Sequence, residues 1–406
     1  MSIHALKDYY LSLEEKEETE EFEEVEEGED VEFDDEEELE VAEEQYDYYA
    51  TVHEELFATF EGLEEVVDSI ELTLEHGGLD PVAAQFAHLA VNSYTSRMGI
   101  PSNDIMPALE SFGGDSGRHS ATTVSVEEAK GRLSKIWEAI KKAWETVWNS
   151  VKTFFARWFT ALGRVDAYAK KVDANIKATK GKSLKKDSTV AIPGILKFDG
   201  GFEIGKVEKG MVNLQDSIKV LDSTYIPACK DVYKKVANDI LNTDPKEEIA
   251  SSESKTGWFS RGGKTFKAMN YTLPGGKSLV GAEGDIPVFK GTGGKDQSEK
   301  GANKISSSEV NMERFHRAAT TLINSAKAIK NSADDFQKES EVQKNKVDGF
   351  FKKVKEEVNY KKAQFKARAF QRNVMSPVVK VASHTYKVSK GLLVVVNKVA
   401  SQYGDA

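Results

Sequence analysis

The acidic and basic side chains of this chain are segregated, and the segregation restricts which parts of it can fold by themselves. Residues 1–110 hold 34 Asp and Glu but 3 Lys and Arg, a net charge of −31, whereas residues 111–406 carry a net charge of +19. Acids fill 21 of the 31 positions in 14–44, and such a block repels itself and buries too little apolar surface to offset the entropy of ordering. A solvated Glu-rich helix is the alternative, but like charges four residues apart destabilise it. We therefore expect residues 1–50 to be a disordered acidic segment.

Apolar residues at helical spacing follow the acidic block and predict a helical hairpin over 51–110. One stripe, spaced by fours and threes, comprises Leu56, Phe60, Leu63, Val67, Ile70 and Leu74. The string His76-Gly77-Gly78 provides a glycine cap for this helix, and Asp80-Pro81 provides a capping acid and a first-turn proline for the next. Residues 99–124 are rich in Gly, Pro, Ser and Thr, which predicts a linker, and the charge changes sign across it.

Four of the five Trp residues lie in one basic amphipathic helix, predicted over 125–161. Its stripe, spaced by fours and threes, comprises Leu133, Trp137, Ile140, Trp144, Val147, Val151, Phe154 and Trp158. A basic helix with an aromatic face is typical of a membrane interface. The alternative, which we favour, is a core helix of a bundle, covered by the long apolar face predicted over 308–372.

The basic part of the chain is predicted to be mostly helical. Residues 111–130 form the linker and the start of the Trp-rich helix, and residues 131–406 form a basic helical body in which Pro227 and Pro377 end helices. Residues 251–304 instead combine Gly-Gly pairs with apolar residues at strand-like spacing, which predicts a small β insertion. The predicted fold class is mainly α: a helical bundle with long amphipathic helices and a small β insertion, preceded by a disordered acidic segment and a helical hairpin.

The sequence contains no recognisable pattern of an enzyme, a cofactor site or a metal site. A phosphate-binding loop needs G-x-x-x-x-G-K-[ST], but Tyr271 and Trp258 stand where the first glycine is required for the strings that end in Ser278 and Thr265. The seven histidines include no pair at ligand spacing. We therefore expect no catalytic, cofactor-binding or metal-binding residues and no cofactor, although a catalytic site assembled from residues distant in the sequence stays open.

Cysteine content and hydropathy limit the class of protein further. Cys229 is the single cysteine, so no intramolecular disulfide can form, and a buried thiol is expected there. The chain has no run of 18 apolar residues, and its first thirty residues lack the apolar region of a secretory signal. We expect neither a transmembrane helix nor a signal peptide.

The excess of lysine and arginine in the basic half predicts an affinity for polyanions. A net charge of +19 attracts DNA phosphates without reading the base sequence. The sequence has no RRM, zinc-finger or helix-turn-helix signature, so any such contact is expected to be non-specific and sensitive to salt. Simple solubility is the alternative explanation for the charge.

Several strings of this sequence carry a resemblance to a known family. They are PALESFGG at 107–114, SATTVSVE at 120–127, GRLSKIWEAIKKAWETVWNSVKTFFARWF at 131–159, HGGLDPVAAQF at 76–86 and YTLPGGKSLV at 271–280. Together they resemble the internal head proteins of giant (jumbo) tailed bacteriophages, also called prohead core or inner-body proteins. The resemblance is closest over residues 75–160.

The resemblance implies an acidic N-terminal propeptide that a phage prohead protease removes. That protease cuts after Glu, with a small residue two positions earlier. Ala108 and Glu110 match this pattern, with Ser111 as the new N-terminus, and Ser125 with Glu127 form a secondary candidate at the predicted start of a helix. The linker supplies the accessible, extended backbone that proteases need, which favours Glu110. The hairpin over 51–110 is then the rest of the propeptide.

The expected function is that of a structural, non-enzymatic internal head protein, located inside the capsid of the virion and in the host cytoplasm during assembly. The resemblance implies the prohead protease and capsid or other core proteins as partners, and the charge adds packaged DNA. The acidic propeptide is expected to neutralise the basic body until it is removed. The alternative is a membrane-interacting or ejected phage protein that uses the Trp-rich basic helix, with a membrane as the less favoured partner.

Overall fold

The structure, a computed structural model, is mainly helical with small β-sheets, as the sequence predicts. It describes residues 35–98, 107–198, 202–242, 266–291, 304–351 and 358–404. The chain forms two compact units, which comprise residues 1–32 with 44–150 and residues 33–43 with 151–406. Two long helices, α2 (Asp35–Leu74) and α4 (Asp115–Ala178), each contribute to both units. The units therefore do not follow the charge boundary of the sequence.

Helix α2 begins earlier than the acidic composition predicts. It starts at Asp35, so the expectation of disorder is wrong for residues 35–50, while residues 1–34 lie outside the described part of the chain. Leu39, Ala42 and Tyr46 are spaced by three and four residues and are each 1% exposed. Their burial stabilises the helix against the repulsion between its many carboxylates.

The first unit consists of most of α2, helix α3 (Pro81–Ser96), the short 3-10 helix η1 (Leu109–Phe112) and the first part of α4. The predicted caps are confirmed, because the Asp80 carboxylate accepts hydrogen bonds from the backbone N–H groups of Val82 and Ala83 at 2.9 and 2.8 Å. Helix α4 begins at Asp115, ten residues before its predicted start. The linker is correspondingly shorter than the 99–124 expected.

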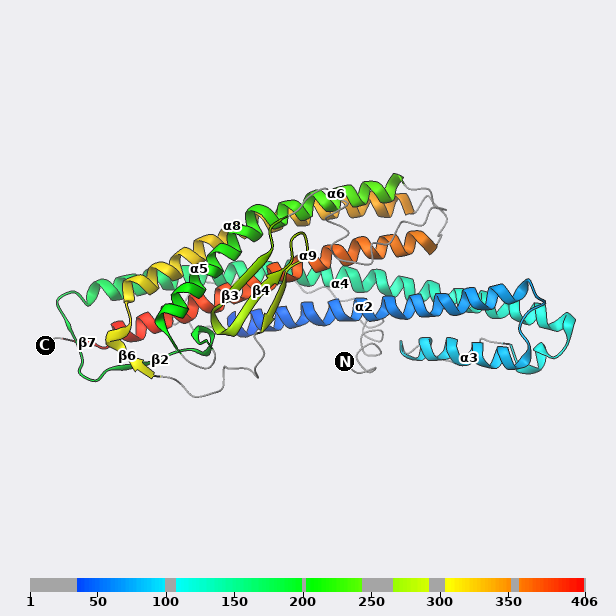
Figure 1. Cartoon of the computed structure of the whole chain (residues 1–406), viewed down its shortest axis with the longest axis horizontal. Helices are drawn as coiled ribbons and strands as arrows, with labels where there is room; N and C mark the ends of the chain where they lie inside the picture. Colours follow the sequence, from blue (N-terminus) through cyan, green and yellow to red (C-terminus); the bar gives the residue numbers. More distant parts are fainter. Residues whose placement is uncertain are drawn as a thin grey trace, which may run out of the picture. The chain divides into compact units, whose positions relative to one another are not determined.

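The second unit is built around α8 (Met312–Phe351), which packs against α5 (Ile204–Val220), α6 (Ile226–Asn242) and α9 (Val358–Ala400) (Figure 1). The apolar face predicted over 308–372 is confirmed in α8 except at its first residue, Met312, which is half-buried. Seven side chains of this face are 0–1% exposed: Phe315, Ala319, Leu322, Ala326, Ile329, Ala333 and Phe336. This stripe forms the centre of the unit's core.

The two prolines expected to end helices do not end them. Pro227 lies in the first turn of α6, where a π-helical turn, η3 (Leu221–Tyr225), joins α5 to α6. Pro377 lies inside α9, near Met375, Val378 and Val379, which are all 0% exposed. Proline removes an N–H donor from the helix ladder, and the Tyr225 hydroxyl donates a hydrogen bond to the Val374 carbonyl in the affected turn at 3.1 Å. Burial of the surrounding residues offsets the helix-breaking tendency of proline.

The predicted β insertion is confirmed as a three-stranded antiparallel sheet. Its strands are β3 (Met269–Leu273), β4 (Lys277–Gly281) and β5 (Val288–Gly291), with Met269 opposite Gly281 and Lys277 opposite Gly291. Two further antiparallel pairs join segments distant in the sequence. These are β2 (Thr189–Ala191) with β6 (Lys304–Ser306), and β1 (Ser183–Leu184) with β7 (Tyr403–Gly404).

His384 of α9 is buried beneath this sheet and gives the second unit a predictable response to acid. Its ring lies 5.5 Å from the Phe289 ring, and burial, with Lys277 and Lys387 nearby, lowers its pKa to about 3. Below pH 6.5 the unfolded chain therefore binds a proton that the folded chain does not, so stability falls as the pH drops from 6.5 towards 3. We expect this histidine to cost about 2 kcal/mol of unfolding free energy at pH 5 relative to pH 8.

Urea unfolding of the wild type and of His384→Gln at both pH values measures this contribution. The variant should lose about 2 kcal/mol less than the wild type on acidification, because glutamine does not titrate. Identical pH dependence of the two proteins would show that His384 is not held neutral.

Candidate functional site

The three residues of the first cleavage candidate lie together on an exposed turn. Ala108 precedes η1, Glu110 and Ser111 lie within it, and all three are exposed. The backbone hydrogen bonds here join residues three apart, from Ser111 N–H to the Ala108 carbonyl at 2.9 Å and from Gly113 N–H to the Glu110 carbonyl at 3.1 Å. One turn of 3-10 helix opens at little cost, so this backbone can become extended in a protease cleft.

The chain is anchored directly after this turn. Phe112 is fully buried, and its ring meets the His88 ring of α3 edge to face at 5.9 Å. Burial against the phenyl ring lowers the pKa of His88. The Arg118 guanidinium donates a hydrogen bond to the Phe112 carbonyl at 3.5 Å. The exposed turn is therefore held at a defined place on the surface of the first unit.

The secondary candidate lies in a very different setting. Ser125 and Glu127 are inside α4, ten or more residues from its start. Ser125 is fully buried, and its hydroxyl donates a hydrogen bond to the Ala121 carbonyl at 2.9 Å. A protease could reach the bond after Glu127 only by unwinding α4, so the geometry favours Glu110 over Glu127.

The Trp-rich stripe of α4 is buried in two different environments. In the first unit, the Trp137 ring lies 5.6 Å from the Phe60 ring, and the Trp144 ring lies 5.8 Å from the His53 ring of α2. The expectation that the helix over 308–372 covers these tryptophans is therefore wrong. Further along α4, in the second unit, α8 does contact this helix, because the Lys330 amine lies 4.4 Å above the Phe159 ring.

Helix α4 is also anchored to α9, through a hydrogen bond from the Trp158 side chain. The Trp158 indole N–H donates to the Ala382 carbonyl at 2.9 Å, and Trp158 is fully buried. Among the described residues, no helix is apolar enough over a sufficient length to cross a membrane.

A row of ion pairs joins the acidic start of α2 to α9 within the second unit, and sequence reasoning missed it. Lys380, Lys387 and Lys390 of α9 form what we call the α9 lysine row, whose side chains are 16–22% exposed. Their amines lie 3.7, 3.1 and 2.6 Å from carboxylate oxygens of Glu43, Glu40 and Glu36, respectively. The acids are spaced by four and three residues, and the lysines by seven and three, so each set shares one helix face. The matching spacing of the acids and the lysines is the feature of the sequence from which these ion pairs could have been predicted.

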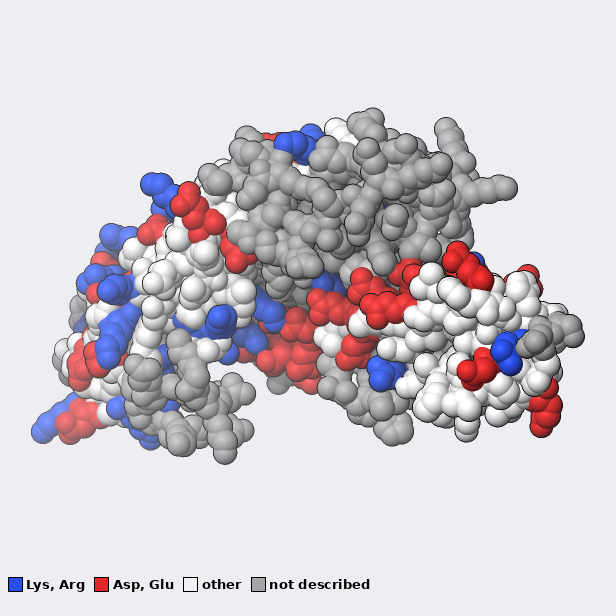
Figure 2. Space-filling view, turned by 45° about the vertical axis from the view of Figure 1, so that its right-hand side comes forward, with Lys and Arg blue, Asp and Glu red and all other residues white. Residues whose placement is uncertain are grey.

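The charge pattern is also visible on the molecular surface. On the face drawn in Figure 2, acidic side chains gather in one patch, whereas lysine and arginine side chains concentrate elsewhere and are interspersed with acids. The α9 lysine row is one place where acidic and basic side chains form ion pairs, and Lys130 with Glu71 is another.

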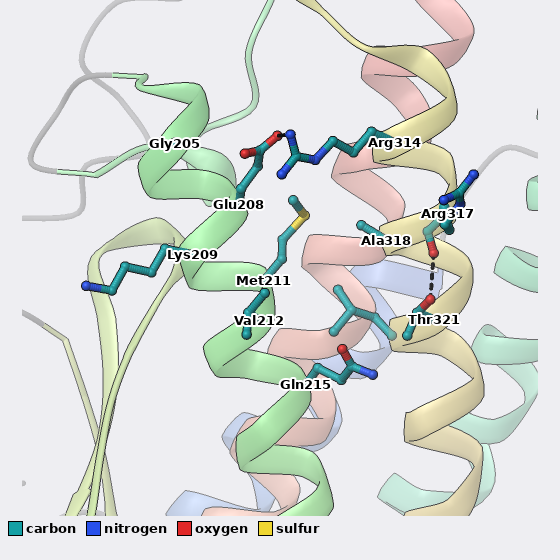
Figure 3. A pocket seen from close by; sticks show the side chains of 11 residues that line it. Gly205, Glu208, Lys209, Met211, Val212, Gln215, Arg314, Arg317, Ala318 and Thr321 are labelled. Carbon is teal, nitrogen blue, oxygen red and sulfur yellow. Dashed lines mark hydrogen bonds and ion pairs between the residues drawn. The ribbon is translucent and has the colours of Figure 1, made fainter.

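A groove between α5 and α8 offers no catalytic arrangement. It has a volume of about 500 Å³, and Glu208 and Arg314 form an ion pair across it at 2.9 Å (Figure 3). Lys209 points away from α8, and the Thr321 hydroxyl donates to the Arg317 carbonyl at 2.8 Å. Glu208 is paired with Arg314, and the Thr321 hydroxyl is bonded within α8, so no nucleophile and base converge among the residues that line the groove.

The other chemistry-bearing residues are structural in the described part of the chain. Cys229 is fully buried, as expected, and burial raises the pKa of its thiol. The string Gly276-Lys277-Ser278 lies in the antiparallel turn between β3 and β4, where no helix follows to cradle a phosphate. The string Gly263-Lys264-Thr265 lies outside the described residues. No cluster of potential metal ligands occurs among the residues that the structure describes.

Comparison with known proteins gives one assignment. A family model described as phiKZ-like phage internal head proteins matches residues 15–401. Neither a curated protein nor a solved structure matches this chain. The match extends over both compact units, from the acidic block to the end of α9.

Proposed function

Because this chain belongs to the family of phiKZ-like phage internal head proteins, we propose that it is a non-enzymatic component of the prohead core that matures by cleavage after Glu110. The observation that carries the cleavage is the exposed η1 turn, which lies where the net charge of the chain changes sign. Cleavage there separates a fragment of charge −31 from a body of charge +19. The partners in this proposal are a phage prohead protease and the capsid or other core proteins.

The geometry around Glu110 supports this position over Glu127. The turn is short and exposed, and it is fixed by the buried Phe112 ring on its C-terminal side. A protease therefore meets an ordered but easily opened substrate. The catalytic groups belong to the protease, and this chain supplies only the sequence and shape of the substrate.

Glu110→Gln, introduced into the phage, is expected to abolish the cut. Amide replaces carboxylate at the residue after which the protease cuts, so the charge that it recognises is lost while the turn keeps its shape. In wild-type particles the body should begin at Ser111, as measured by N-terminal sequencing and mass spectrometry of denatured particle proteins. In the variant, residues 1–110 should stay covalently joined to the body.

Glu127→Gln is the matched control, since it makes the same change within α4. It should leave the cut and its position unchanged. Wild-type particles that contain an uncut chain, or a body that begins at Ala129 or Glu128, would contradict the proposed site.

We propose further that the basic body contacts packaged DNA without sequence preference, through lysines at which phosphates replace the carboxylates of α2. The α9 lysine row supports this, because three partly buried amines are neutralised by carboxylates of the acidic segment. Phosphates could take the place of those carboxylates, since both are anionic oxygen ligands for lysine. The covered Trp-rich stripe gives no comparable support to a membrane-binding function.

A further inference from the structure

We propose that a single cut after Glu110 does not release the acidic fragment, so that the cleaved protein persists as a complex of two chains. This inference rests on the cleavage proposed above and concerns the fate of the two pieces. The sequence alone suggests that the fragment is released, because a strongly acidic segment joined through a linker is expected to neutralise the body and to leave once the linker is cut. The structure shows that the segment also supplies much of a hydrophobic core.

The acidic fragment provides one side of the core of the first unit. Eight apolar side chains of α2 in this unit are at most 6% exposed: Tyr46, Val52, Leu56, Phe57, Phe60, Leu63, Val67 and Ile70. On α4, the side chains of Ile136, Trp137, Ile140, Trp144, Val147 and Trp148 are at most 7% exposed. The Phe60–Trp137 and His53–Trp144 ring contacts join the two sets at 5.6 and 5.8 Å. Cutting one exposed peptide bond removes none of these contacts.

Polar contacts between the fragment and α4 add specificity to this core. The Leu79 backbone N–H donates to the Thr122 hydroxyl at 2.8 Å, and both lie in the interior. The buried Arg132 guanidinium donates to the Thr95 hydroxyl of α3 at 2.9 Å. Departure of the fragment would leave that hydroxyl and guanidinium without these protein partners, which opposes dissociation.

Both ends of the fragment are also held. At the cut itself, Phe112 stays on the body and inserts beside His88 of the fragment. In the second unit, Leu39 and Ala42 of the fragment are each 1% exposed, beside the ion pairs of the α9 lysine row. The tether lost at Glu110 contributes only an effective concentration, of about millimolar for a short flexible linker. The contacts, rather than the covalent bond, therefore decide whether the fragment stays.

The test uses the full chain with the recognition sequence of a site-specific protease inserted between Glu110 and Ser111. After complete cleavage, size-exclusion chromatography at about 1 μM should recover roughly nine-tenths or more of the fragment with the body, which corresponds to a Kd of about 10 nM or tighter. Co-elution should persist in about 1 M NaCl, where charges are screened beyond about 3 Å but apolar contacts are not. Separation of the two chains in native buffer, at low or high salt, would overturn the proposal.

Matched variants identify what holds the fragment. Phe60→Ala should weaken retention about a hundredfold after cleavage, because it removes a fully buried ring that faces Trp137. Leu72→Ala, on the same helix but 65% exposed, should retain the fragment like the wild type. Equal retention by both variants would overturn the assignment to the core.

A second experiment omits the inserted sequence, so that disruption of the turn by the insertion cannot explain the result. Residues 1–110, carrying an affinity tag, and residues 111–406, untagged, are co-expressed as two chains. The tag should retain both, and recovery of the tagged fragment alone would overturn the proposal. Neither experiment depends on where the natural protease cuts, so failure here leaves the Glu110 experiment unaffected, and failure of that experiment leaves this one interpretable.

Discussion

Trp144→Asp is expected to unfold the first unit while leaving the second folded. Trp144 is 1% exposed and is packed between the His53 ring and the Trp148 ring, which lies 5.7 Å away. Truncating a buried tryptophan costs about 3–5 kcal/mol, and an unpaired buried carboxylate adds to that cost. The sum is comparable to the whole stability of a typical domain, about 5–15 kcal/mol. Near-UV circular dichroism and limited proteolysis should show loss of tertiary structure confined to residues before about 150.

Phe86→Asp is the matched control for this substitution. Phe86 is also an aromatic residue of the first unit, but it is 67% exposed, so a carboxylate there stays hydrated. Its effect on stability should be within about 0.5 kcal/mol. A Trp144→Asp protein with the protease resistance of the wild type would show that α2 does not cover the tryptophans, and the membrane or partner alternatives for the stripe would then regain support.

The triple variant Glu36→Gln, Glu40→Gln and Glu43→Gln is expected to bind DNA more tightly than the wild type, with a steeper dependence on salt. It removes the three carboxylates that pair with the α9 lysine row without removing a buried apolar side chain. Three additional phosphate contacts steepen the log–log salt slope by about 2.7, which is about a fortyfold greater loss of affinity between 50 and 200 mM salt. Fluorescence anisotropy with a duplex of random sequence measures both quantities.

The triple variant also changes the net charge of the chain, so a control must remove the same charge from other positions. Glu65→Gln, Asp68→Asn and Glu75→Gln remove the same charge from exposed positions of α2 and the turn after it. This control should tighten binding far less, because it leaves the lysine row paired. Equal behaviour of the two triple variants would show that overall charge, rather than this row, governs DNA contact.

Local patterns in the sequence were sufficient to place most helices and their buried faces. The spacing of Phe315, Leu322 and Phe336 identifies the core face of α8, and all three are buried. The Asp80-Pro81 string marks the start of α3 and caps it as predicted. Such features are predictable because they depend on neighbours within one or two turns of the same helix.

Features that depend on tertiary partners were not predictable in the same way. A stripe such as that of Trp144 identifies the face that must be buried, but several helices of this chain offer a matching face, and α2 rather than α8 covers it. The acidic composition concealed the short apolar pattern of Leu39, Ala42 and Tyr46, whose burial makes the helix stable. Pro377 was likewise judged by its local propensity, which the surrounding packing overrides.

The candidate cleavage site was found through resemblance, and its physical setting came from the structure. Sequence composition placed Glu110 in a linker, and the structure refines this to a single exposed turn beside a buried Phe112. The ion pairs of the α9 lysine row were missed because the lysines and their partner carboxylates lie more than 300 residues apart in the sequence. Long-range pairing of charged helices leaves only a weak periodic signal in each partner.

Helix α4 runs without interruption from Asp115 to Ala178, yet its residues up to Ser150 belong to one compact unit and those from Val151 to the other. A continuous helix is therefore not one cooperative element, because each half draws its stability from a different core. If the first core opens, a helix of this kind can fray from its N-terminus and stop where the second core begins. The boundary near residue 150 would then act as a stop for local unfolding, so that damage to the acidic side of the protein need not propagate into the body.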